Sequence, residues 1–325
     1  MNKFIAVTIG DIRGIGIDIF LKLYSENKIK NVVLFSNYQI INKYLKKNKF
    51  NLKTNLYNNL YKNYNYRKNY LNVYSYKCNS NEENTINSII FSHKECIKKK
   101  FIGVVTLPIR KDIIIEKINI NFTGHTEFLQ NMENKKYSNM ILIHNKIIVS
   151  PLTTHIKLNS VSKKILNKDF IYNQITNLNS TLKKDLNIKK PRLIVSGLNP
   201  HAGENGKIGK EEIIINKIIK KLKKNKINIK GTVSADSMLI DIKKYDCFIY
   251  MYHDQALIPF KYISKFTGIN YTGNLDIIRV SPDHGTAYNL KGKKKISDTS
   301  IKKCFILINK INKNRSINNV SKKIS

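Results

Sequence analysis

The chain of 325 residues lacks the features that define several protein classes. No two of its four cysteines have the close Cys-x-x-Cys spacing, so we expect reduced thiols without a functional role. No apolar run approaches the length that spans a bilayer, and the N-terminus lacks the cleavage pattern of a signal peptide. These absences predict a cytoplasmic protein without a membrane segment.

Acidic residues are scarce: 22 Asp and Glu stand against 58 Lys and Arg, which gives a formal net charge of +36. Such a charge attracts nucleic acids, anionic lipids and acidic metabolites alike, so it identifies no partner. Lysine is spread through the chain together with abundant asparagine and isoleucine, all of which have A/T-rich codons. We therefore expect no specific nucleic-acid partner. A basic nucleic-acid-binding protein is the distant alternative, and it predicts tight binding with a steep salt dependence.

Short apolar runs alternate with segments of helical periodicity, and the length favours two lobes. Strands alternating with helices, with one hairpin at 140–150, predict an α/β sandwich with a mostly parallel sheet. Residues 52–84 are dominated by Asn, Tyr and Lys, and we interpret them as a loosely structured excursion. The expected strands cover 5–8, 32–35, 102–106, 140–143, 147–150, 193–196 and 247–251, and the expected helices cover 17–24, 168–186, 211–222 and 300–312.

The common nucleotide-binding fingerprints are missing as well. The spacing of Gly10, Gly14 and Gly16 differs from Gly-x-Gly-x-x-Gly, and no Lys-Ser/Thr follows as in a P-loop. We therefore infer no Rossmann domain from this segment.

Three histidines each follow an expected strand: His155 follows 147–150, His201 follows 193–196, and His253 follows 247–251. Because the carboxyl ends of parallel strands meet at one edge of a sheet, we expect these imidazoles at one rim. A lone histidine is more often a core or surface group, but three at equivalent positions favour a shared site. Imidazole is the commonest side-chain ligand of borderline divalent metals, and three ligands leave positions open for a substrate.

Other segments have residues that bind anions. Residues 122–127 (Phe-Thr-Gly-His-Thr-Glu) combine a hydroxyl and an imidazole at an expected helix start, where free N–H groups bind anions; the alternative is capping by Thr123 or Thr126. Arg279 lies among apolar neighbours, where burying a cation is costly without an anion. Residues 281–287 (Ser-Pro-Asp-His-Gly-Thr-Ala) let the backbone approach a ring or a phosphate closely, or form an ordinary loop.

Six motifs together resemble those of the 4-hydroxythreonine-4-phosphate dehydrogenase family of pyridoxal phosphate biosynthesis. Their order and spacing match, and the resemblance covers residues 4–312. Several long motifs in order are far more specific than any one of them. The motifs are Phe-Thr-Gly-His-Thr-Glu at 122–127, Thr-Thr-His at 153–155, Gly-Leu-Asn-Pro-His-Ala-Gly-Glu at 197–204, Ala-Asp-Ser at 235–237, Met-Tyr-His-Asp-Gln at 251–255 and Ser-Pro-Asp-His-Gly-Thr-Ala at 281–287.

The resemblance implies a two-lobed α/β/α sandwich like that of isocitrate and isopropylmalate dehydrogenases. It implies a cofactor lobe formed by residues 1–120 and 285–325. A second lobe, residues 121–284, would hold the metal and substrate and form the dimer contact. The active site would lie between the lobes of a homodimer and would be shared by its two subunits.

The resemblance also assigns residues by their places in the motifs. It implies three metal ligands, His155, His201 and His253, of which His253 reaches the partner's site. Asp236 and Lys261 are the catalytic candidates, and a metal-bound water is a third possible proton acceptor. The implied substrate-binding residues are His125, Thr126, Lys261, Asn270 and Arg279, and the implied cofactor-binding residues are His284, Gly285 and Thr286.

The implied reaction oxidises 4-phosphohydroxy-L-threonine with NAD or NADP and one divalent ion, zinc, magnesium or cobalt. The product, 2-amino-3-oxo-4-phosphohydroxybutanoate, then loses carbon dioxide to give 3-amino-2-oxopropyl phosphate. A sister dehydrogenase acting on a sugar-acid phosphate, such as D-erythronate 4-phosphate, is the alternative. The chain departs from the family pattern at residues 9–17, 272–276 and 291–294. At these places the rigidity of the loop and the preference for substrate or cofactor could differ from those of the family.

Overall fold

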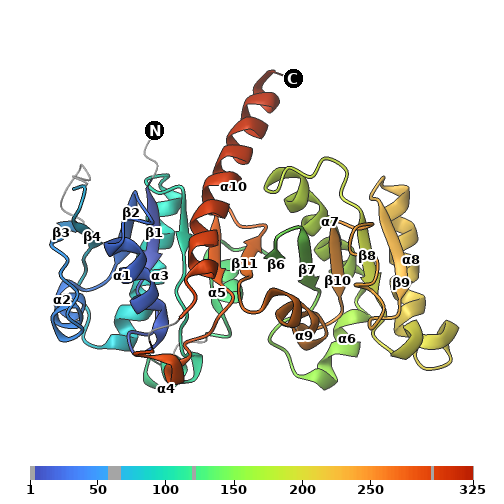
Figure 1. Ribbon diagram of the computed structural model, residues 1–325. Helices are drawn as coiled ribbons and strands as arrows, with labels where there is room; N and C mark the ends of the chain where they lie inside the picture. The colour runs from blue at the N-terminus through green and yellow to red at the C-terminus, as the bar shows by residue number, and fades with distance from the viewer. Residues whose placement is uncertain (1–3, 58–66, 119–121, 294–295, 325) are drawn as a thin grey trace. The chain divides into compact units, whose positions relative to one another are not determined.

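The computed structural model describes residues 4–57, 67–118, 122–293 and 296–324 (Figure 1). The chain divides into two compact units. The first comprises Met1–Thr123 and Asp276–Asn312, and the second comprises Gly124–Leu275 and Lys313–Ser325.

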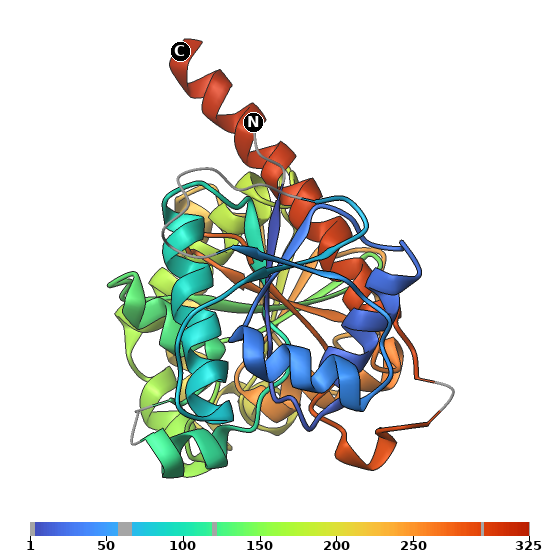
Figure 2. The ribbon, with the colours of Figure 1, turned by 90° about the vertical axis from the view of Figure 1, so that its left-hand side faces the viewer.

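The first unit has a parallel sheet in the order β3-β4-β2-β1-β5-β12. Its central strands are short, apolar and buried, as expected for a parallel sheet covered on both faces. Figure 2 shows α3 on one side of these strands and α1 on the other. The elements are β1 (Ile5–Thr8), α1 (Ile15–Ser25), β2 (Val32–Phe35), α2 (Tyr38–Lys47), β3 (Thr54–Tyr57), β4 (Leu71–Tyr74), α3 (Asn81–Ile97), β5 (Gly103–Val105), α4 (Lys111–Ile118), β12 (Arg279–Pro282), η3 (Tyr288–Leu290) and the start of α10 (Thr299–Ile324).

The second unit has strands in the order β11-β6-β7-β10-β8-β9, in which β6 pairs antiparallel with β11 and β7 while β7, β10, β8 and β9 pair in parallel. The β6–β7 hairpin confirms the prediction for residues 140–150. Helix α9 packs against β7 and β10, while α7 packs against β6, β11 and α8. The elements are α5 (His125–Met132), β6 (Asn139–His144), β7 (Ile147–Pro151), η1 (Leu158–Ser160), α6 (Val161–Ile165), α7 (Lys168–Lys184), β8 (Leu193–Ser196), η2 (Pro200–Gly206), α8 (Glu211–Lys224), β9 (Ile229–Val233), β10 (Cys247–Tyr250), α9 (His253–Ser264) and β11 (Ile269–Gly273).

The interpretation of residues 52–84 as a loose excursion is wrong where the structure describes them. Strands β3 and β4 pair in parallel there, and α3 begins at Asn81. Leu71 and Val73 are fully buried, and between them the buried amide of Asn72 bonds Asn55 and the backbone of Arg67. Because these polar groups are satisfied by hydrogen bonds, the strands form despite their composition. Residues 58–66 of the segment lie outside the described residues.

The last helix is longer than the sequence predicts, since α10 continues to Ile324 beyond the expected end at 312. Its extension belongs to the second unit, where it contacts Asp185, which is 2% exposed and follows α7. Arg315 donates to both carboxylate oxygens of Asp185, at 2.7 and 3.2 Å, and the hydroxyl of Tyr271 donates to the same carboxylate. Asn314 donates to the Asp185 carbonyl. Polar contacts of this kind produce no apolar periodicity in the sequence, so the pattern does not predict that the helix continues beyond residue 312.

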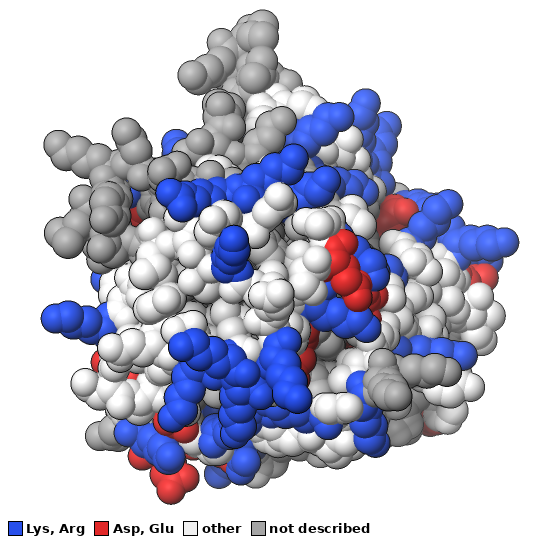
Figure 3. Space-filling model, turned by 60° about the vertical axis from the view of Figure 1, so that its left-hand side comes forward, with Lys and Arg blue, Asp and Glu red and all other residues white. Residues whose placement is uncertain are grey.

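Other expectations concern the cysteines, the membrane and the charge. All four cysteines are free thiols. Among the described residues, no helix is long and apolar enough to cross a bilayer. On the face shown in Figure 3, lysine and arginine side chains lie in several separate groups rather than in one continuous stripe. This arrangement agrees with a dispersed charge.

Candidate metal and substrate site

Three neighbouring parallel strands of the second unit lead to the three histidines. Strands β7, β10 and β8 lie side by side, and their carboxyl ends lead to His155, His253 and His201, respectively. The side chain of Gln255 joins two of these strand ends: it accepts from the Met251 N–H and donates to the Gly197 carbonyl. The fold therefore delivers all three loops to one edge of this sheet, as the strand pattern predicts.

Two of the three imidazoles lie side by side. The ring centroids of His155 and His253 are 5.7 Å apart. Nδ1 of His155 lies 2.9 Å from a carboxylate oxygen of Glu127, and Nδ1 of His253 lies 3.1 Å from one of Asp254. Because a carboxylate only accepts, each ring donates from Nδ1 and keeps its Nε2 lone pair available for a metal. Two such imidazole nitrogens are donors of the kind that a borderline divalent ion prefers, but a metal site needs further ligands.

His201 is not part of that pair. It is exposed on η2, and within the described parts of the chain no three His, Cys, Asp or Glu side chains are close enough together to hold a metal ion. The structure therefore brings together two of the three expected ligands.

The loop that carries His201 has an unusual backbone. Five successive residues, 201–205, have φ between 43° and 76°, a left-handed region that is costly for residues other than glycine. The carboxylate of Glu212, 2% exposed, stabilises the approach to this turn by accepting from the backbone N–H groups of Leu198 and Asn199, each at 2.8 Å. A Cβ on Gly203 would lie 2.4 Å from the same carboxylate, so only glycine fits there. The position of His201 thus depends on a buried acid.

Glu127 and Glu212 are two residues of the candidate site to which the sequence motifs assign no role. Glu127 lies at the end of the motif at 122–127, and Glu212 lies in the first turn of the helix after the His201 loop. Acidic residues at such places are ordinary for helix starts, so the sequence does not show that these two reach the histidine loops.

The environment of Glu127 favours its ionised form. Burial alone would raise the pKa of its carboxyl, but the hydrogen bond from His155, the positive charge of His155 when protonated and the hydrogen bond from Thr154 lower that pKa to about 2. At neutral pH a carboxylate therefore faces His155.

Three of the expected substrate residues of the second unit lie on two elements, α5 and β11. His125 begins α5, where Gly124 is the N-cap and no side chain caps the helix, so the capping alternative is wrong. Thr126 is buried, and its hydroxyl lies 3.4 Å from that of Thr272. On β11, the amide oxygen of Asn270 is buried without a hydrogen-bond partner among the described residues. Such an oxygen fits a polar ligand.

Two further candidates of the second unit are more open to solvent. The ammonium of Lys261, on α9, lies 4.6 Å from the centroid of the Phe266 ring. Asp236 is exposed in the turn after β9, and β9 runs parallel to the strand that leads to His201. Asp236 therefore follows the carboxyl end of a strand at the same edge of the sheet.

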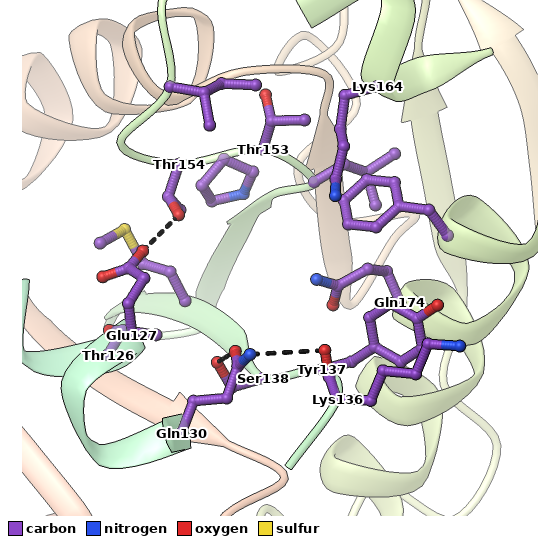
Figure 4. A pocket seen from close by; sticks show the side chains of 15 residues that line it. Thr126, Glu127, Gln130, Lys136, Tyr137, Ser138, Thr153, Thr154, Lys164 and Gln174 are labelled. Carbon is purple, nitrogen blue, oxygen red and sulfur yellow. Dashed lines mark hydrogen bonds between the residues drawn. The ribbon is translucent and has the colours of Figure 1, made fainter. Parts of the chain in front are cut away.

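A polar cavity of about 170 Å³ adjoins the Glu127–Thr154 hydrogen bond (Figure 4). Its walls come from α5, the loop before β6, the segment after β7, α6 and α7. Hydroxyl and amide groups and the amines of Lys136 and Lys164 line it. The Glu127 carboxylate lines the same cavity, so the lining is of mixed charge and suited to a small polar molecule.

The remaining candidates belong to the first unit. Arg279 is 2% exposed on β12, and its Nε donates to the Thr106 hydroxyl at 2.9 Å. The expected cofactor residues 284–286 form the turn after β12. A Cβ on Gly285 would meet nothing within 4 Å, while the Thr286 carbonyl accepts from the Ile15 N–H at the start of α1. The backbone at Gly285 is therefore open to a ligand.

Comparison with known proteins extends these observations. Residues 28–308 match the family model of the pyridoxal phosphate biosynthetic protein PdxA. A 4-hydroxythreonine-4-phosphate dehydrogenase from Wigglesworthia glossinidia brevipalpis is 35% identical over 98% of this chain and 99% of its own length. The sequence resemblance is thus confirmed along nearly the whole chain.

Solved structures agree with the fold. The crystal structure of 4-hydroxythreonine-4-phosphate dehydrogenase from Klebsiella pneumoniae has a TM-score of 0.80 and 27% identity, covering 95% of this chain and 99% of its own. Isocitrate dehydrogenase from Methylococcus capsulatus has a TM-score of 0.53 at 10% identity, covering 97% and 87%, which shows a likeness of fold alone. The predicted α/β class and its isocitrate dehydrogenase-like architecture are confirmed.

Proposed function

From the premise that the chain belongs to the PdxA family of pyridoxal phosphate biosynthetic proteins, we propose that it oxidises 4-phosphohydroxy-L-threonine at its secondary alcohol, with NAD or NADP as hydride acceptor. The product, 2-amino-3-oxo-4-phosphohydroxybutanoate, then decarboxylates to 3-amino-2-oxopropyl phosphate. We propose that this reaction takes place in the cytoplasm.

The observation that carries the proposal is the pairing of His155 with His253 at the ends of adjacent strands. Each ring has its Nδ1 on a carboxylate, which leaves Nε2 for a metal. We propose His201 as the third ligand. A divalent ion held there, zinc, magnesium or cobalt, supplies Lewis-acid polarisation of the substrate's alcohol and ketone oxygens.

The other candidates position the substrate. His125, Thr126, Lys261 and Asn270 would bind its polar and anionic groups together with Arg279, and such anchoring orients the reacting carbon for hydride transfer. The buried amide oxygen of Asn270, without a partner among the described residues, supports this role. Asp236 and Lys261 are the proposed proton acceptors for the alcohol, and a metal-bound water is the third candidate.

The cofactor and the assembly complete the proposal. Residues 1–120 with 285–325 would form the cofactor side, where His284, Gly285 and Thr286 would receive the adenosine half of the nucleotide. The open backbone at Gly285 supports this. Residues 121–284 would hold metal and substrate and form a homodimer with a shared active site. Because His253 lies beside His155 of its own chain, we propose that these two rings hold one metal, in place of the expectation that His253 reaches the partner's site.

The test of this function is a comparison of two substrates. The metal-loaded protein should reduce NAD or NADP with 4-phosphohydroxy-L-threonine, and removal of the metal with a chelator should abolish the reaction reversibly. Nicotinamide absorbance follows the reaction. Turnover of D-erythronate 4-phosphate with a higher kcat/KM would instead assign the sister activity, and reduction with neither substrate would contradict the proposal.

A further inference from the structure

The side chain of Glu127 makes two contacts through one oxygen. Its Oε1 accepts from the Thr154 hydroxyl at 2.7 Å and from Nδ1 of His155 at 2.9 Å. Its other oxygen, Oε2, is buried and has no hydrogen-bond partner among the described residues. A carboxylate from α5 thus reaches across to two successive residues of the loop after β7.

The backbone around this contact leaves no spare room. A Cβ on Gly124 would lie 2.7 Å from Oε2 of Glu127 and 2.9 Å from Cε1 of His155. Both separations are far below van der Waals contact, so the N-cap of α5 packs directly against the carboxylate and the ring. The side chains of Glu127 and His155 are each 24% exposed. The pair is therefore enclosed on the side of α5.

The carboxylate beside His253 is different. Asp254 is the next residue in the chain, and its side chain is 73% exposed. Solvent screens such a contact, and exposed ion pairs contribute little. Of the two imidazoles, His155 is the one held by a partly buried carboxylate from another element.

We infer that Glu127 is a positioning residue that fixes the Nδ1–H tautomer and the orientation of His155, so that Nε2 faces the metal. This inference rests on the proposed metal site. A carboxylate behind a ligating imidazole also increases the basicity of the ring, and loss of such a partner typically weakens metal binding about 10- to 100-fold.

The test compares Glu127→Ala with Glu127→Gln. Alanine removes the acceptor, while glutamine keeps a neutral acceptor oxygen. Cobalt titration followed by visible absorption should show about 10- to 100-fold weaker binding by Glu127→Ala and a smaller loss by Glu127→Gln. Glu116→Ala, an exposed acid on α4, is the matched control and should bind cobalt as the wild type does.

A second measurement does not depend on the metal. Nitrogen-15 NMR of histidine side chains, recorded without metal well above the ordinary imidazole pKa of about 6.5, reports the tautomer of each ring. The His155 signal, identified by its loss in His155→Ala, should show the Nδ1–H form in the wild type and in Glu127→Gln. A shift toward the Nε2–H form is expected in Glu127→Ala.

The outcomes separate this inference from the proposed function. Unchanged cobalt affinity with an unchanged His155 tautomer in Glu127→Ala would overturn the inference. If the wild type failed to bind cobalt, the proposed metal site would fail, and the tautomer measurement would still decide whether Glu127 holds His155. If Glu127→Ala did not fold, a wild-type cobalt affinity in Glu127→Gln together with an Nε2–H tautomer of His155 in the wild type would overturn the inference.

Discussion

Replacing His201 with alanine should abolish nicotinamide reduction and metal retention while leaving the fold intact. His201 is one of the three proposed ligands, so its loss removes the metal and with it several kcal/mol of transition-state stabilisation by polarisation. This corresponds to a fall in kcat/KM of about a thousandfold or more. Because His201 is exposed on η2, its truncation should change the free energy of unfolding by no more than about 0.5 kcal/mol.

Three measurements decide this prediction: turnover, metal content after gel filtration, and denaturant unfolding. His144→Ala is the matched control, since His144 lies at the end of β6 and has no place in the proposed site. Its turnover should match the wild type. Wild-type turnover in His201→Ala would refute the ligand role, and an unfolded variant would show that the loop is structural.

Replacing Arg315 with methionine should destabilise the protein by about 3–5 kcal/mol, because it leaves the carboxylate of Asp185 buried without its cationic partner. The side chains of Arg315 and Asp185 are only 13% and 3% exposed. The Tyr271 hydroxyl bonds the same carboxylate, and burial and the neighbouring Asp185 raise the pKa of that tyrosine well above its ordinary value. A tyrosine hydroxyl is never cationic, and with its pKa raised it stays protonated as a donor, so it cannot replace the guanidinium charge.

Denaturant unfolding measures this loss, and Arg192→Met provides the control. Arg192 pairs with Asp246 at 2.9 Å, but these side chains are 46% and 24% exposed, so the control should cost no more than about 1 kcal/mol. The double variant Asp185→Asn with Arg315→Met should lose less than Arg315→Met alone, since it removes the unpaired charge. Equal destabilisation by Arg315→Met and Arg192→Met would show that the buried Asp185–Arg315 pair contributes no more to stability than an exposed ion pair.

The sequence predicts most of the strands because buried strands consist mainly of apolar residues, which are visible as short runs. Residues 193–196 and 247–250 are mostly apolar and are buried in β8 and β10. The same pattern places histidines after three strands, and parallel pairing then brings their loops to one edge without any knowledge of contacts. For this reason the candidate site could be found from strand exits alone.

Other features escape prediction because they depend on polar contacts between distant residues. Strand β4 contains Asn72, whose burial depends on hydrogen bonds that its composition does not reveal. The extension of α10 depends on Asp185, which lies 130 residues before Arg315. Likewise, the sequence does not show that Glu127 reaches His155 across 28 residues. Apolar periodicity reports burial, but it does not report which polar groups meet.

The central claim is that imidazoles from separate strand ends bind one cation. X-ray absorption at the zinc edge of the zinc-loaded protein tests it most directly, since imidazole ligands have a recognisable scattering pattern. We expect about three imidazole nitrogens per zinc at about 2.0–2.1 Å, and one fewer in any zinc that His201→Ala still binds. A zinc site with oxygen ligands and no imidazole, or a protein that retains no zinc, would contradict it.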